Sequence, residues 1–225
     1  DRIPDLVYSF DPKYGAWLPC VRERRYDAQL GGSGRYAEPM DGAAKKKRLP
    51  PDFVRPDPEW TEEEGRPALK FAKGCYLTLP QEAIPRGAVY ALSFEIKPAG
   101  AENQVLLRTR ATDDHDCGLQ LVLENGTLRI SHFGILLVPR HFDTGFPLKP
   151  GEWNTVTIQK DFEKICATVN GQKREFGYDR RARRFQACVF GGNVAPGPGI
   201  PDTVAPFTGL LRALRVKHDF LTGAE

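Results

Sequence analysis

The chain has 225 residues, of which 40% are hydrophobic and 27% charged, a length that fits one large β-domain or two small ones. This apolar content exceeds that of disordered chains, and no stretch approaches the roughly 18 consecutive apolar residues that cross a bilayer, which excludes disorder and a membrane span. The 32 basic and 29 acidic residues leave a net charge of +3, too balanced to indicate a nucleic-acid-binding protein.

The first predicted element is a strand near the N-terminus. Leu6, Tyr8 and Phe10 alternate on one face, and the pattern stops at Asp11-Pro12. Residues 13–65 then show no regular period and too few aliphatic residues for a core of their own. We therefore interpret 13–65 as a long irregular insertion within a single domain that spans residues 1–225.

From residue 66 onward, short apolar runs bounded by turn residues predict a series of strands. They cover residues 68–71, 75–79, 88–97, 103–109, 118–124, 127–133, 153–160, 164–169, 172–176, 186–190 and 208–216. Asn125-Gly126 and Asn170-Gly171 each predict a tight hairpin turn between two alternating strands. No long segment has apolar residues at helical spacing. The predicted class is all-β, with two antiparallel sheets packed face to face.

The order and spacing of six segments resemble a known family. The segments are Arg66-Pro-Ala-Leu-Lys-Phe, Gly74-Cys-Tyr-Leu-Thr-Leu-Pro, Tyr90-Ala-Leu-Ser-Phe-Glu-Ile-Lys-Pro, Gly151-Glu-Trp-Asn-Thr-Val-Thr-Ile, Ala167-Thr-Val-Asn-Gly and Phe207-Thr-Gly-Leu-Leu-Arg-Ala-Leu-Arg-Val. Together they resemble the laminin-G-like, concanavalin A-like jelly roll over residues 66–218, with 5–11 as its first strand. The resemblance implies that Trp153 occupies the core, and it fails over 13–65. Because lectins, adhesion modules, hydrolases and lyases share this fold, function must be argued from sites.

Catalysis by a retaining glycosidase would require two carboxylates about 5 Å apart on one strand face. Asp114 and Asp116 have suitable spacing but fall in a turn, and Glu62 and Glu64 fall in the predicted loop. The Glu-x-Asp-x-x-Glu signature of sandwich glycosidases and the Gln-Ile-His strand of sandwich alginate lyases are both missing from the sequence. We therefore expect a non-catalytic protein, although the insertion could roof a groove in a polysaccharide-active hydrolase or lyase.

An acidic turn is a candidate calcium site. Asp113, Asp114 and Asp116 supply carboxylates from one loop, and Asp11 is a possible further ligand. Laminin-G-like domains often hold calcium at a sandwich rim. The alternative is a solvated hairpin tip, where Asp is common because its side chain bonds to the backbone.

Candidate ligand-binding residues fall into two groups. Trp17, Tyr36 and Trp60 could stack on the apolar face of a sugar, or they could pin the insertion to the sandwich. Four arginines together with the basic run 45–48 could bind sulfated or carboxylated polymers, or form solvated loops. These arginines are Arg180, Arg181, Arg183 and Arg184.

The five cysteines are widely separated and include no Cys-x-x-Cys pair, which argues against a zinc site or a redox motif. Cys75, Cys166 and Cys188 lie in apolar runs and are predicted to be ordinary buried thiols. One disulfide remains open, without a deducible pairing.

The leading hypothesis is a non-catalytic module of a larger extracellular or cell-envelope protein that binds carbohydrate or protein, with a carbohydrate or glycoprotein as the favoured ligand. Calcium is its one possible cofactor. The alternatives are the polysaccharide-active enzyme and a structural domain that packs against a neighbouring catalytic domain of its parent chain.

Overall fold

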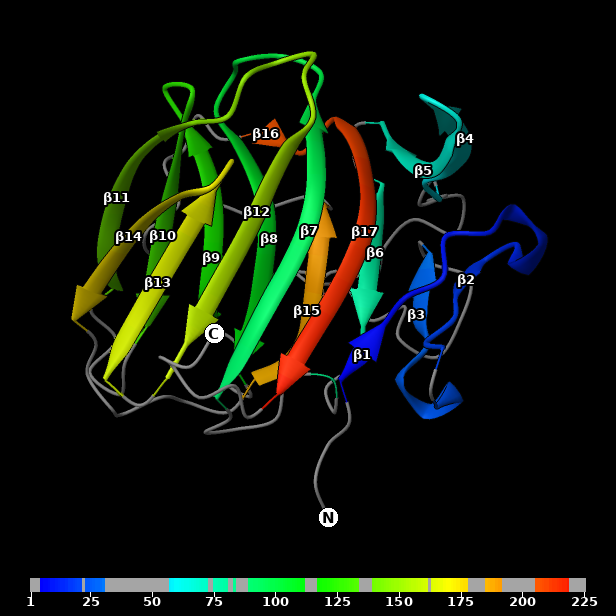
Figure 1. Ribbon diagram of the computed structural model, residues 1–225, viewed down its shortest axis with the longest axis horizontal. Coiled ribbons are helices and arrows are strands. Elements are labelled where there is room, and N and C mark those ends of the chain that lie inside the picture. The colour runs from blue at the N-terminus through cyan, green and yellow to red at the C-terminus, as the bar shows by residue number, and fades with distance from the viewer. Residues whose placement is uncertain are drawn as a thin grey trace, which may run out of the picture.

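The fold consists of two antiparallel β-sheets that lie face to face, as the computed structural model shows (Figure 1). The structure describes residues 5–21, 23–30, 57–72, 75–80, 83, 89–111, 117–133, 139–161, 163–177, 185–191 and 205–218. Within these, the side chains at 109–111, 117–118, 132–133, 139–140 and 185–188 are not described. The helical elements in these ranges are two 3-10 turns, η1 (Pro12–Tyr14) and η2 (Arg24–Tyr26).

The first sheet has eight strands. Its spatial order is β14 (Gln172–Gly177), β13 (Lys164–Val169), β12 (Asn154–Lys160), β7 (Tyr90–Pro98), β17 (Gly209–His218), β5 (Arg66–Phe71) and β4 (Glu59–Glu63), and β1 (Leu6–Val7) also pairs with β17. In Figure 1 this sheet lies in front of the other.

The second sheet has nine strands. Its spatial order is β11 (Pro139–Pro147), β10 (Thr127–Phe133), β9 (Cys117–Glu124), β8 (Gln104–Ala111), β15 (Phe185–Gly191), β6 (Tyr76–Leu79), β3 (Ala28–Leu30) and β2 (Trp17–Leu18). The short β16 (Ala205–Pro206) runs parallel to β8.

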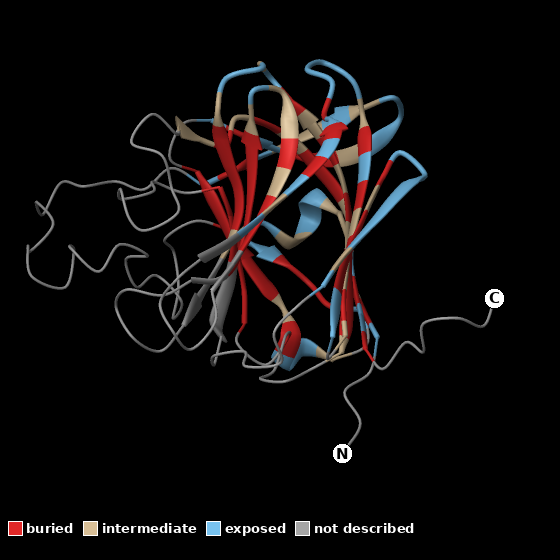
Figure 2. Ribbon diagram, turned by 90° about the vertical axis from the view of Figure 1, so that its left-hand side faces the viewer, coloured by how far each residue is buried: buried red, intermediate tan, exposed pale blue. Residues whose placement is uncertain are grey.

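The core lies between the two sheets and follows from strict alternation along the strands. In β7, Leu92, Phe94 and Ile96 are fully buried, whereas Ser93 and Glu95 between them point outward. Phe94 meets Phe190 of the opposite sheet edge to face, with ring centroids 5.1 Å apart. Figure 2 shows the buried residues concentrated along the strands of both sheets. The predicted all-β sandwich is therefore confirmed.

Both predicted hairpins are present. Asn125 and Gly126 have φ of 50° and 76° between β9 and β10, and Asn170 and Gly171 have φ of 49° and 82° between β13 and β14. Positive φ at both central residues is the geometry that matches the twist of the flanking strands.

The irregular segment predicted at 13–65 contains more structure than expected. β2, β3 and β4 lie within it and extend both sheets. β2 and β3 are too short to leave a detectable period, and β4 reads as polar because it is an edge strand with three glutamates. β11 was also missed, because prolines at its two ends and a glycine inside it are depleted in strands.

Two predictions about single side chains have different outcomes. Cys75 and Cys166 are buried free thiols, as predicted, and Cys20 is a third among the described residues. The placement of Trp153 in the core is wrong. Strand β12 begins one residue later, and the half-buried Trp153 ring lies against the guanidinium of Arg212, 3.7 Å from its ring centroid.

A bulge in β17 lets one strand edge serve two partners. Gly209 to Leu211 pair with β5, whereas Arg215 and Val216 pair with β1, and the register against β7 shifts between Arg212 and Arg215. Ala213 sits inside this bulge with φ of 57°. An L-residue with a Cβ is strained there, because the left-handed conformation costs about 1–2 kcal/mol outside glycine.

Replacing Ala213 with Gly is expected to stabilise the protein. The change removes the left-handed penalty but adds conformational freedom to the unfolded chain, which leaves a net gain of about 0.5–1 kcal/mol. Urea denaturation measures this gain as a higher midpoint at constant slope. The control is Ala167→Gly, in a core-facing position of β13, which should destabilise; a loss of stability in both variants would contradict the assignment of strain to Ala213.

Candidate functional site

A row of side chains crosses the outer face of the nine-stranded sheet, on the side away from the core. Strand register places these residues directly opposite one another, so they share one face. In order from β2 to β11 they are Trp17, Gln29, Thr78, Val189, Arg108, Gln120, Ser131 and His141. We call this set the transverse row. Their chain neighbours Leu18, Leu30, Leu77, Leu79, Phe190, Leu107, Leu121 and Ile130 belong to the core, which fixes the direction in which the row points.

Most of the row is polar, and its interior is buried. Gln29 is 1% exposed and Gln120 is fully buried, although both side chains point away from the hydrophobic core. Among the described residues, neither the amide nitrogen nor the amide oxygen of either glutamine has a hydrogen-bond partner. An unsatisfied buried polar group costs about 1–3 kcal/mol, so these two positions call for an explanation beyond folding.

At one end of the row lies Trp17, one of the predicted sugar-binding aromatics. Its side chain is 37% exposed and stands on the same face as Gln29 in the neighbouring strand β3. The exposed indole is an apolar platform. The carboxamide beside it is buried in the free protein and would supply a donor and an acceptor only to a ligand that displaces its cover.

The segment that carries Trp17 is held in place by Trp60, which was predicted to bind ligand itself. The Trp60 indole N–H donates to the carbonyl oxygen of Gly15 at 2.8 Å, and its half-buried ring meets Phe10 edge to face at 6.4 Å. Both features of Trp60 are engaged inside the protein. These contacts agree with the alternative that Trp60 pins the segment, and ligand binding by Trp60 stays a prediction.

At the other end of the row, Ser131 and His141 form a pair. The Ser131 Oγ and the His141 Nδ1 are 2.8 Å apart, Ser131 is buried, and His141 is exposed. Partial desolvation of the imidazole lowers the pKa of His141, the nearby Arg129 guanidinium lowers it further, and Glu124 opposes the shift. Arg129 is itself paired with Glu124 at 2.5 Å.

Of the remaining predicted site residues, Asp11 is the one that the structure describes. Asp11 caps the turn η1 and pairs with Lys13, so its carboxylate is engaged locally. The other predicted site residues lie outside the described part of the chain: Tyr36, Arg180, Arg181, Arg183, Arg184, Asp113, Asp114 and Asp116. Among the residues that are described, no group of three or more His, Cys, Asp or Glu could hold a metal ion. Calcium at the acidic turn stays a prediction.

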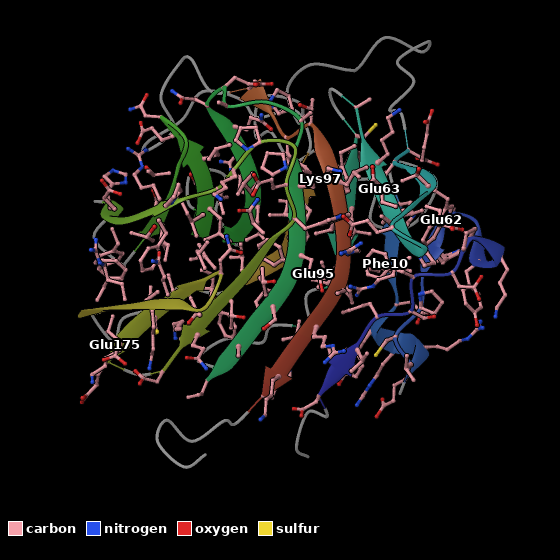
Figure 3. The ribbon with its side chains drawn as sticks, turned by 45° about the horizontal axis from the view of Figure 1, so that its top comes forward. Phe10, Glu62, Glu63, Glu95, Lys97 and Glu175 are labelled. Carbon is pink, nitrogen blue, oxygen red and sulfur yellow. The ribbon has the colours of Figure 1, made fainter. Side chains whose placement is uncertain are left out.

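Carboxylates also gather on the outer face of the eight-stranded sheet, and those of Glu63, Glu64 and Glu95 are paired. The Arg212 Nε donates to Glu95 at 2.6 Å, and its Nη2 meets Glu64 at 3.4 Å. Lys97 pairs with Glu63 at 3.0 Å. Figure 3 shows Glu63, Glu95 and Lys97 close to one another, where β4, β7 and β17 approach. These pairs neutralise the acids and connect β4, the turn after it, β7 and β17. We therefore assign these carboxylates a role in stabilising the sheet.

Sequence reasoning singled out Trp17 as a candidate and did not identify the polar interior of the row. A signal was present, because Gln120 interrupts the apolar run Leu119 to Leu123, and Gln29 lies between Ala28 and Leu30. A glutamine at an alternate position of an otherwise apolar strand indicates a buried amide on the outer face, but strand register is needed to join several such positions.

Comparisons with known proteins agree on the fold. No family model matches the chain, and no curated protein matches it. Domain 4 of AbnA, an extracellular GH43 arabinanase of Geobacillus stearothermophilus solved with arabinotriose, has a TM-score of 0.64 and 16% identity, with 94% of this chain and 90% of that chain covered. The chain thus has the fold of a known carbohydrate-complexed domain over nearly its whole length.

Two further solved structures share the jelly roll over about half of their length. Mouse laminin alpha1 domains LG4-5 match with a TM-score of 0.54 and 17% identity, covering 74% of this chain and 45% of that chain. The binding domain of botulinum neurotoxin serotype G matches with a TM-score of 0.59 and 11% identity, covering 99% and 49%. The laminin-G-like jelly roll inferred from the sequence is therefore the fold of this protein. No helix in the described part of the chain is long and apolar enough to cross a membrane.

Replacing either unpaired glutamine with the similarly shaped Met is expected to stabilise the free protein. Gln29→Met and Gln120→Met each remove two unsatisfied buried polar atoms, a gain of about 1 kcal/mol that thermal or urea unfolding would measure. Gln104→Met is the matched control. Its amide oxygen accepts from the Thr208 N–H at 3.0 Å, so this variant should lose stability. Destabilisation of the Gln29 and Gln120 variants would show that their amides are satisfied in solution.

The His141 imidazole is expected to titrate below the ordinary histidine value of about 6.5. Its neutral form is favoured in the folded state, so stability falls as pH drops through the unfolded-state pKa. An NMR titration of the His141 ring measures this pKa directly, and Arg129→Gln should move it upward. A pKa at or above the ordinary value in the native protein would refute the assigned environment.

Proposed function

We propose that this protein is a non-catalytic carbohydrate-binding module and that the transverse row is its binding face. The observation that carries the proposal is the pairing of the exposed Trp17 ring with the unpaired, buried Gln29 amide on one face. Sugars have apolar faces edged by hydroxyl groups, and an aromatic ring beside free hydrogen-bonding groups matches both features.

Two of the solved structures that share this fold have sugar-containing ligands, which supports a carbohydrate ligand here. Domain 4 of AbnA was solved with arabinotriose, and the cell entry of botulinum neurotoxin type C, whose structure shares the fold, depends on two ganglioside molecules. Because identities are 11–17%, these likenesses support the fold and the class of ligand rather than a particular sugar. An extracellular or cell-envelope location within a larger protein, next to other domains, follows as part of the proposal.

Binding is expected on a printed glycan array that includes arabinotriose, read with fluorescently labelled protein in calcium and again in EDTA. Trp17→Ala should lower the affinity for a bound glycan about tenfold by removing the stacking platform, as measured by isothermal titration calorimetry. Val21→Ala is the matched control, since Val21 is an exposed apolar residue of the same segment outside the row. Retention of no glycan on the array, in either buffer, would overturn the proposal.

A further inference from the structure

The two ends of the transverse row repeat one arrangement. At each end an exposed ring lies outermost and an unpaired, buried carboxamide lies further in, with Trp17 and Gln29 at one end and His141 and Gln120 at the other. Gln29 follows Trp17 by one strand, and Gln120 follows His141 by two, with Ser131 between them. Each end therefore has an exposed ring and an unpaired buried amide, but at the second end Ser131, hydrogen-bonded to His141, lies between them.

Strand spacing sets the distance between these ends. With about 4.8 Å per strand, the four intervals from β3 through β6, β15 and β8 to β9 separate the two amides by about 19 Å, and the seven intervals from β2 to β11 span about 34 Å. The residues at both ends of the row lie on strands of one sheet, so the distance between the two ends is fixed. A ligand that meets both must be extended and must run perpendicular to the strands.

The chemistry of the row indicates the charge of that ligand. Its members Gln29, Thr78, Gln120 and Ser131 are uncharged. The cation within the row, Arg108, already interacts within the protein, and the Arg129 guanidinium beside the row is neutralised by Glu124. Amides and hydroxyls pair well with neutral hydroxyl groups. A polyanion would instead call for several convergent cations.

We propose that the protein has two sugar subsites, at Trp17/Gln29 and at Gln120/Ser131/His141, and that one linear, neutral polysaccharide chain occupies both. This inference rests on the proposed carbohydrate-binding function. Occupation of the second subsite by the same chain is intramolecular, so it strengthens binding as soon as the chain is long enough to reach.

The test is calorimetry with ladders of arabino-, xylo- and cello-oligosaccharides of increasing length. Short members should bind weakly with two molecules per protein. Members that span about 19 Å or more should bind one per protein, with an affinity step of at least about tenfold. Gln120→Met should reduce the stoichiometry of the short members to one and abolish the step, and Gln29→Met should do so from the other end. Thr155→Ala, on the outer face of the other sheet, is the control.

Several outcomes would overturn the two-subsite inference and leave the proposed function standing. They are one-to-one binding of short members to the native protein, a length step that survives Gln120→Met, and array binding confined to branched or charged terminal sugars. If no glycan of any kind binds, the proposed function fails as well, so the two failures are distinguishable. Unfolding curves of both glutamine variants establish that any lost binding does not reflect a lost fold.

Discussion

The shared edge of β17 is the constraint on which the rest of the sandwich depends. One side of this strand is filled by β7, and the other side holds β5 and β1 in succession. Along this edge, the part of β17 that pairs with β5 is separated from the part that pairs with β1 by a bulge at Ala213, where β17 shifts its register against β7. The bulge also presents the Leu214 carbonyl to the Tyr8 amide at 3.2 Å, and that hydrogen bond seats the N-terminal strand.

Both halves of this edge contribute to the position of Trp17. From the β1 half, Tyr8 bridges to Cys20, and the Ser9 amide donates to the Pro19 carbonyl at 2.9 Å. From the β5 half, β4 carries Trp60 to the Gly15 carbonyl. The segment with β2 is thus held at two points that lie far apart in the sequence. An aromatic platform held this way loses little conformational freedom when a ligand stacks on it.

The sequence predicted the parts of this arrangement that depend on local chemistry. Asn125-Gly126 demands a hairpin, and the alternation in β7 demands one buried face, so both were predictable. The polar face was not, because the row joins residues from strands as distant in sequence as Gln29 and Gln120, and register between such strands is a property of the folded sheet. Trp60 shows the same limit, since its partner Gly15 lies 45 residues away.

On the proposed function, the unpaired amides of Gln29 and Gln120 would link stability to binding. A protein selected for stability alone would fill these positions with apolar side chains, because the valines at 105, 122 and 189 show that the outer face accepts them. An unsatisfied amide costs free energy in the free protein, and a ligand hydroxyl that pairs with it recovers that cost at the moment of binding. Both amides are buried in the free protein, so a ligand that pairs with them must first displace what covers them, and this cost reduces the recovered free energy. On the proposed function, the same atoms that weaken the unliganded sheet would favour the complex.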